Sequence, residues 1–291
     1  MTPDYATDVA DSSCVIAGET IAGRLWLGSS LYPSPQVMGE AIAAARPGFV
    51  TVSVRRQSAA QLQEQVSEHG HWTLLNHYLQ HSQARLLPNT AGCHSAREAV
   101  MLAQMARELF RTEWIKLEVT GDDYTLQPHP LQLVEAAREL LRQGFKVLPY
   151  CTDDLVLCRT LLELGCPAVM PWGAPIGTGK GLLNLYQLRT LRERLSDAVL
   201  IIDAGIGRPS QAMAALEMGF DAVLLNTAVA AAADPVAMAA AFRQAVQGGR
   251  MAYQAGLISE RDQASPSTPV PGLPFWHQTG AGDGTGSGGS R

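Results

Sequence analysis

The sequence alternates eight times between a short apolar stretch and a longer, mostly helix-like segment. Expected strands cover residues 24–28, 49–54, 86–90, 114–119, 146–150, 168–171, 198–203 and 222–225. Expected helices cover 35–45, 95–110, 130–142, 153–164, 182–195, 208–218 and 228–246, and the polar stretch 58–83 is expected to be helical in parts. Strand-then-helix alternation is typical of a parallel sheet, and such a sheet closes at eight units. We therefore predict an α/β fold, a TIM (β/α)8 barrel.

The 291 residues, of which 46% are hydrophobic, can form one large core, since single-domain α/β barrels reach about 250 residues. We expect a flexible N-terminus over residues 1–13, one barrel domain over 14–261 and a tail over 262–291. Short strands within 14–21 could plug one end of the barrel. The tail is rich in Gly, Ser and Pro, so most of it is expected to be disordered.

Charge and cysteine content narrow the function classes. A net charge of -5 without a basic stripe argues against nucleic acid as a partner. The five cysteines form no CxxC pair and indicate free thiols in a reducing compartment. With no signal-like segment and no apolar run of membrane length, we expect a soluble, cytoplasmic protein that does not bind membranes. His77 and His81 have metal-ligand spacing but no supporting ligands, so no metal site is predicted.

Two charged residues lie on the fourth expected strand. There, Lys116 and Glu118 share one face with Trp114, while apolar residues form the other face. If the apolar face packs on helices, both charges point into the barrel, roughly 6.5 to 7 Å apart along the chain. A desolvated lysine loses basicity and becomes a nucleophile near neutral pH, as Schiff-base chemistry requires. An inward ion pair with a structural role is the alternative.

Other candidate residues lie at the ends of later strands, because barrel active sites form at the C-terminal ends of the strands. Asp203 ends an apolar strand and needs a partner, for which Lys116 is within reach. Gly205 follows that strand, and Asn226-Thr227 follows the eighth, where this fold commonly binds phosphate. We infer a phosphorylated substrate, although a tight turn for the glycine and a helix cap for Asn226-Thr227 stay open.

Five motifs together resemble the thiazole synthases of bacterial thiamine biosynthesis, over about residues 14 to 255. They are Asn89-Thr90-Ala91-Gly92-Cys93, Trp114-Ile115-Lys116-Leu117-Glu118-Val119, Met170-Pro171-Trp172-Gly173-Ala174-Pro175-Ile176-Gly177, Ile202-Asp203-Ala204-Gly205-Ile206-Gly207 and Val223-Leu224-Leu225-Asn226-Thr227-Ala228. The resemblance implies a (β/α)8 enzyme without a cofactor. Its substrates would be 1-deoxy-D-xylulose 5-phosphate, dehydroglycine (2-iminoacetate) and the C-terminal thiocarboxylate of a sulfur-carrier protein, and its product a thiazole phosphate carboxylate.

The resemblance also implies roles for single residues. Lys116 matches the Schiff-base lysine, and Glu118 and Asp203 match acidic groups that transfer protons. An imine at the lysine acidifies the neighbouring carbon, so a carboxylate can move the proton that lets the ketone migrate along the sugar. The positions expected to bind the sugar phosphate are Gly177, Ala204, Gly205, Asn226 and Thr227.

The chain departs from the family pattern at two places. Gly28-Ser29-Ser30-Leu31-Tyr32 stands where we expect a Gly-Thr-Gly-Lys-Tyr type loop, and Trp172 stands where we expect leucine. Either change could alter carrier docking or substrate access. Two alternatives stay open: a class I Schiff-base aldolase acting on a sugar phosphate, and an inactive barrel that binds the carrier. A homo-oligomer is expected, because the stretch 58–83 and the alanine-rich last helix could pack against another subunit.

Overall fold

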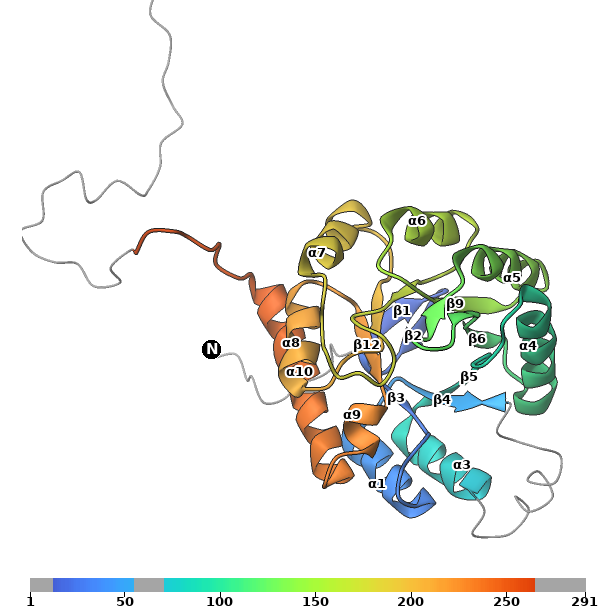
Figure 1. Cartoon of the computed structure of the whole chain (residues 1–291). Coiled ribbons are helices and arrows are strands. Elements are labelled where there is room, and N and C mark those ends of the chain that lie inside the picture. Colours follow the sequence, from blue (N-terminus) through green and yellow to red (C-terminus); the bar gives the residue numbers. More distant parts are fainter. Residues whose placement is uncertain (1–12, 55–70, 265–291) are drawn as a thin grey trace, which may run out of the picture. The chain divides into compact units, whose positions relative to one another are not determined.

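The computed structural model describes residues 13–54 and 71–264, apart from the side chains of residues 71–74, 80 and 81 (Figure 1). All helices and strands reported below belong to one compact unit that ends at Leu257. In the second unit, residues 258–264 are exposed and contain no helix or strand. The predicted N-terminus up to residue 12, the stretch 58–70, the His81 side chain and the tail from residue 265 lie outside the described residues.

Eight parallel strands form the barrel within the described part of the chain. Their hydrogen-bonded order is β10, β9, β6, β5, β4, β3, β12, β11. Parallel bridges from Val169 to Leu200 and from Trp172 to Asp203 join β10 to β11 and close the ring. The predicted (β/α)8 barrel is therefore confirmed. The strands are β3 (Leu25–Gly28), β4 (Phe49–Ser53), β5 (Arg85–Asn89), β6 (Trp114–Leu117), β9 (Lys146–Cys151), β10 (Met170–Pro171), β11 (Ile201–Asp203) and β12 (Ala222–Leu225).

Helices surround the sheet (Figure 1). Several begin at a residue whose side chain accepts a hydrogen bond from a backbone N–H of the first turn, which offsets the unpaired donors there. Ser34, Ser95 and Asp154 do so for α1, α4 and α6. These and further helices are α1 (Pro35–Ala45), α3 (His71–Ser82), α4 (Ala96–Phe110), α5 (Pro130–Arg142), α6 (Leu155–Glu163), α7 (Leu185–Arg194) and α8 (Pro209–Glu217).

The alanine-rich last helix differs from the prediction of one continuous helix over 228–246. The structure has two helices, α9 (Thr227–Ala230) and α10 (Pro235–Ala255). Asp234 is the N-cap of α10, and its side chain accepts a hydrogen bond from Ala237 N at 2.9 Å. Pro235 follows at the first helical position, where no backbone N–H is required. The alanines favour helix on both sides of the break, so helix propensity alone does not reveal it.

The N-terminal hairpin of β1 (Cys14–Ile16) and β2 (Glu19–Ile21) closes one end of the barrel. Its Ile16 and Ile21 belong to the same buried cluster as Trp26, Phe49 and other inward-facing residues of the strands. Glu19 forms ion pairs with the first residues of two strands, Arg85 of β5 and Lys146 of β9. The predicted plug is thus confirmed, and it fills the N-terminal ends of the strands and leaves the C-terminal ends open.

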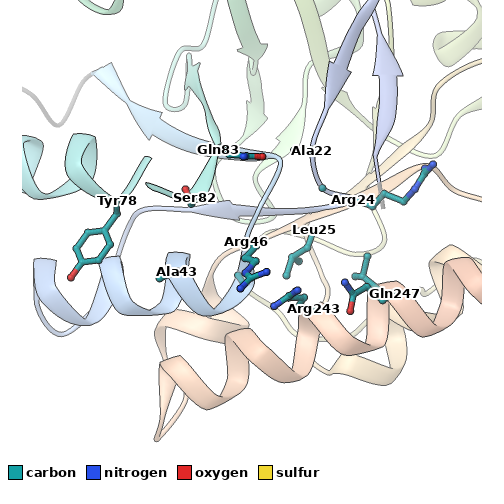
Figure 2. Close-up of a pocket in the computed structure, with 13 residues that line it drawn as sticks. Ala22, Arg24, Leu25, Ala43, Arg46, Tyr78, Ser82, Gln83, Arg243 and Gln247 are labelled. Atoms are coloured by element: carbon teal, nitrogen blue, oxygen red, sulfur yellow. The ribbon is translucent and has the colours of Figure 1, made fainter. Parts of the chain in front are cut away.

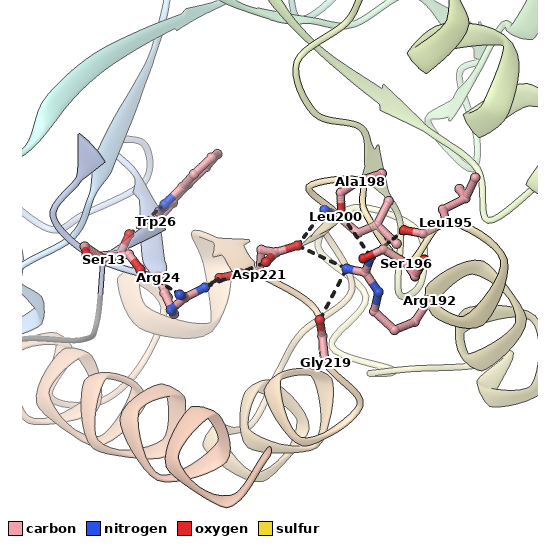
Figure 3. A network of polar contacts seen from close by, with 11 residues as sticks. Ser13, Arg24, Trp26, Arg192, Leu195, Ser196, Ala198, Leu200, Gly219 and Asp221 are labelled. Carbon is pink, nitrogen blue, oxygen red and sulfur yellow. Dashed lines mark hydrogen bonds and ion pairs between the residues drawn. The ribbon is translucent and has the colours of Figure 1, made fainter. Parts of the chain in front are cut away.

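A polar network ties three strands together at the same end (Figure 3). Asp221, just before β12, accepts a hydrogen bond from Leu200 N at 3.0 Å and lies 3.1 Å from Arg192 Nη1. Its own carbonyl accepts from Arg24, just before β3, at 2.7 Å. Arg192 also donates to the carbonyl of Ala198, so the end of α7 is fixed to the strand that follows it. Asp221 is therefore the centre of the contacts that join β3, β11 and β12.

Candidate active site

A cavity of about 520 Å³ opens at the C-terminal ends of the strands. All eight residues predicted to form the site line it: Lys116, Glu118, Gly177, Asp203, Ala204, Gly205, Asn226 and Thr227. They come from the C-terminal ends of β6 and β11 and from the segments that follow β6, β10, β11 and β12, which are far apart in the sequence. The expectation that these strand ends meet is confirmed.

Lys116 lies between two carboxylates. Its Nζ is 2.6 Å from Asp203 Oδ2 and 3.4 Å from Glu118 Oε1. The three residues are buried, with exposed fractions of 6% for the lysine, 2% for the aspartate and 8% for the glutamate. The predicted alternation in β6 holds, because Ile115 and Leu117 pack on the opposite side, in the cluster that includes helix residues. The arrangement is a compact acid–base group within the cavity.

The protonation of this group differs from the expectation of a weakly basic lysine. Burial alone would lower the pKa of Lys116, but Asp203 and Glu118 together hold this pKa above its ordinary value. Burial raises the pKa of Asp203 to about 6, against the opposing effect of Lys116. The resting lysine is therefore an ammonium. To become a nucleophile it must give up a proton, and Asp203 is in contact and titrates near neutral pH.

Thr90 holds the backbone that bears Glu118. The Thr90 Oγ1 accepts a hydrogen bond from Glu118 N at 2.8 Å and donates one to Glu118 O at 2.7 Å. The threonine is fully buried, so water cannot replace either bond. It follows β5, the strand beside β6. The sequence shows that this strand end is polar, but it does not reveal that the Thr90 hydroxyl binds the backbone of Glu118.

The loops after β10 and β11 pack closely against each other. Ala204 and Gly205 are both left-handed, with φ of 66° and 78°. A Cβ at Gly205 would lie 2.4 Å from Ala174 N, so glycine is required there by both conformation and space. The tight turn considered for Gly205 exists, and the same residue also lines the cavity. Across from it, Gly177 is left-handed too, and a Cβ there would be 4.0 Å from Thr227 Oγ1.

Asn226 is at the N-cap position of α9 but makes no capping hydrogen bond with its side chain. Its Nδ2 instead donates to Ser30 O at 3.1 Å, in the loop after β3. Its Oδ1 is buried and has no hydrogen-bond partner among the described residues. The helix-cap interpretation is therefore wrong for Asn226, which binds the loop after β3 and lines the cavity.

The two departures from the family pattern lie differently in the structure. Ser30 and Leu31 of the loop after β3 line the cavity, so this loop forms part of its wall. Trp172 is not among the lining residues, and its Nε1 donates to Asp153 Oδ1 at 2.9 Å. The larger side chain therefore does not narrow the cavity.

A second cavity, of about 680 Å³, lies at the opposite end of the barrel (Figure 2). It is bordered by residues just before β3 and by parts of α1, α3 and α10. Its charged lining residues are Arg24, Arg46 and Arg243, without a lysine or a carboxylate. This cavity cannot support imine chemistry, which points to the first cavity as the candidate active site.

Two further features bear on cofactors and membranes. Within residues 13–54 and 71–264, no group of three or more His, Cys, Asp or Glu side chains is arranged to hold a metal ion. Over the same residues, no helix has both the length and the apolar character needed to cross a bilayer.

A closed parallel barrel with a buried lysine between two carboxylates at its C-terminal mouth defines a barrel enzyme equipped for imine chemistry. The family model described as thiazole biosynthesis protein ThiG matches residues 15–269 of the chain. The chain belongs to the thiazole synthase family and is an enzyme of thiamine thiazole synthesis.

Individual relatives agree with this family. A thiazole synthase of Paracidovorax citrulli is 58% identical over 275 residues, covering 94% of this chain and 98% of the relative. That of Ralstonia pickettii is 59% identical over 259 residues, covering 89% and 92%. Among solved structures, a chain of the Amycolatopsis orientalis BexX/CysO complex matches with a TM-score of 0.74 and 29% identity, covering 85% of this chain and 98% of that chain. Of the three interpretations left open above, these relatives favour thiazole synthase.

Proposed function

We propose that Lys116 forms an imine with 1-deoxy-D-xylulose 5-phosphate. Dehydroglycine and sulfur from a thiocarboxylated carrier protein then complete the thiazole phosphate carboxylate. The observation that carries this proposal is the contact of Lys116 Nζ with Asp203 at 2.6 Å and Glu118 at 3.4 Å inside the cavity. A buried ammonium with two adjacent carboxylates can lose a proton to become a nucleophile, and the carboxylates can move the protons of the later steps.

The first step is loss of a proton from the Lys116 ammonium to Asp203, its nearest carboxylate. The free amine then attacks the sugar ketone, and water leaves as the imine forms. The imine withdraws electrons from the adjacent carbon, whose proton becomes acidic. Glu118, the second carboxylate beside the lysine, accepts that proton and returns it to the imine carbon. The hydroxyl on the adjacent carbon passes its proton to the nitrogen and becomes the new carbonyl, so the carbonyl moves along the sugar. The new carbonyl is then the point of sulfur addition.

The sugar phosphate is proposed to bind through Gly177, Ala204, Gly205, Asn226 and Thr227. The closely packed Gly205 and the open space at Gly177 support this, because loops without side chains let peptide N–H groups reach an anion. Asn226 Oδ1, which has no partner within the described residues, can accept a hydrogen bond from a sugar hydroxyl.

A sulfur-carrier protein is the proposed partner at the mouth of this cavity. The matched Amycolatopsis orientalis chain comes from a complex of BexX with CysO, which supports a protein partner here as well. Residues 176–180, beside the cavity, are all exposed and include two glycines, so an extended carrier terminus could lie over them.

A homo-oligomer in the cytoplasm completes the proposal. Met101, Met105 and Leu109 are exposed at four-residue spacing on α4, which supports contact with another subunit. The five cysteines are all free and buried, and this supports a reducing compartment.

Turnover of a Lys116→Ala variant tests the proposed function. Thiazole formation from the sugar phosphate, dehydroglycine and thiocarboxylated carrier should be lost, while the far-UV circular dichroism spectrum stays that of the wild type. Lys116→Arg is the matched control, because it keeps a positive charge between the carboxylates but cannot form the imine, and it should be equally inactive. Turnover by either variant at the wild-type rate would overturn the proposal.

A further inference from the structure

The ring of Tyr150 lies beside the candidate catalytic lysine, and its hydroxyl is buried without a hydrogen-bond partner among the described residues. It lies near the end of β9, is 2% exposed and lines the 520 Å³ cavity. Within the described residues, its Oη has no hydrogen-bond partner. Buried hydroxyls are nearly always hydrogen-bonded, because water is lost without compensation otherwise. An unpaired hydroxyl on a residue that lines the cavity is therefore a donor that a ligand can satisfy.

The surroundings of Tyr150 set which role this hydroxyl can take. Its ring centroid is 5.5 Å from Lys116 Nζ. In the parallel pairing of β6 with β9, Leu117 is opposite Pro149. The next residues along the two chains, Glu118 and Tyr150, are therefore at the same height in the barrel. Burial raises the pKa of Tyr150 far above its ordinary value, and the charges of Asp203 and Glu118 raise it further. The phenol therefore stays protonated and acts as a hydrogen-bond donor.

We propose that Tyr150 is a further catalytic residue, whose hydroxyl donates a hydrogen bond to the oxygen of the substrate carbonyl that Lys116 attacks. This inference rests on the proposed function. As the bond from nitrogen to carbon forms, the carbonyl electron pair moves onto oxygen, where a nearby donor stabilises the charge. The oxygen then leaves as water, and both of its protons come from the Lys116 ammonium by way of Asp203. Tyr150 keeps its own proton throughout.

The Tyr150→Phe variant isolates the hydroxyl. Phenylalanine keeps the ring beside Lys116 and fills the same space, so packing is retained. Because the deleted group has no partner, its loss should not lower the melting temperature. The hydroxyl thus contributes to catalysis and not to stability. A residue with only a structural role would show the opposite result.

Tyr32 provides a matched control. Its hydroxyl is also buried without a hydrogen-bond partner in the described part of the chain, yet Tyr32 lines neither of the two cavities described above. Tyr32→Phe removes the same kind of group from a place that does not contact substrate. Its melting temperature should be at least that of the wild type, and its activity should equal that of the wild type.

The experiment combines thermal unfolding, steady-state turnover and the rate of imine formation, measured by timed borohydride quenching with 1-deoxy-D-xylulose 5-phosphate. Tyr150→Phe should melt no lower than the wild type but form the Lys116 adduct about 10- to 100-fold more slowly, with a matching loss in kcat/KM. Wild-type adduct formation in this variant, or a loss of stability, would overturn the role of Tyr150 alone. Absence of the adduct in the wild type would overturn the proposed function as well.

Discussion

Lowering the pH should inactivate the enzyme through Asp203 before the fold is lost. The pKa of Asp203 is raised to about 6 by burial, so its carboxylate is about 90% ionised at pH 7 and about 10% ionised at pH 5. Only the ionised form can take the proton of Lys116, 2.6 Å away. The rate of imine formation at low sugar concentration should therefore fall about tenfold between pH 7 and pH 5.

The raised pKa of Asp203 also makes the free energy of unfolding depend on pH. The folded-state pKa of Asp203 is about 6 and its ordinary value is 3.8, so folding favours the protonated form. The resulting stability is fully present below pH 3.8 and is lost as the pH rises through 6. The shift corresponds to about 3 kcal/mol. Asp203→Asn cannot ionise, so the wild type should lose about 2 kcal/mol more than this variant between pH 4 and pH 7, because at pH 4 the unfolded-state carboxyl is already partly ionised.

Two assays check this prediction. Stopped-time borohydride quenching gives the pH–rate profile, and urea denaturation of the wild type and of Asp203→Asn gives the difference in unfolding free energy at each pH. Asp203→Asn should be about 100-fold slower at pH 7 and should lose the acidic limb of the profile. A flat wild-type profile down to pH 5, or an acidic limb that persists in the variant, would refute the role given to Asp203.

The remaining predictions concern positioning and stability. Thr90→Val removes both hydrogen bonds to the Glu118 backbone and leaves two buried groups unpaired, so urea denaturation should show a loss of about 1–3 kcal/mol and turnover should fall about tenfold. Unchanged turnover in Thr90→Val would show that Glu118 needs no such support. Asp221→Ala removes the carboxylate beside Arg192 and the acceptor of Leu200 N at the far end of the barrel, so it should lower the unfolding free energy by about 2 kcal/mol with kcat unchanged. A fall in kcat without a loss of stability would contradict this assignment.

The barrel and most of the site could be predicted from the sequence because both depend on periodicity. Alternation of side chains along β6 already places Lys116 and Glu118 on one face, and parallel strands bring their C-terminal ends to one edge. Asp203 could be paired with Lys116 for the same reason, although 86 residues separate them in the sequence.

The features that the sequence did not reveal depend on contacts between residues that are far apart in the sequence. Burial lowers the pKa of Lys116, and the charges of Asp203 and Glu118 raise it. Which effect is larger depends on the distances from Lys116 to the two carboxylates, and a local sequence pattern does not contain these distances. Asn226 binds a carbonyl of a loop 196 residues earlier, so its amide does not cap the helix it begins. Tyr150 differs from an ordinary core tyrosine because it lines the cavity and its hydroxyl has no hydrogen-bond partner within the described part of the chain. The break before α10 was marked by Asp234 and Pro235, but the alanines around it obscured the signal.

The most direct test of the account is to reduce the protein with borohydride in the presence of 1-deoxy-D-xylulose 5-phosphate and to map the modified peptide by mass spectrometry. We expect one sugar adduct, on Lys116, and none in the Lys116→Arg variant. No adduct in folded protein that still binds the sugar phosphate, or an adduct on another lysine, would contradict it.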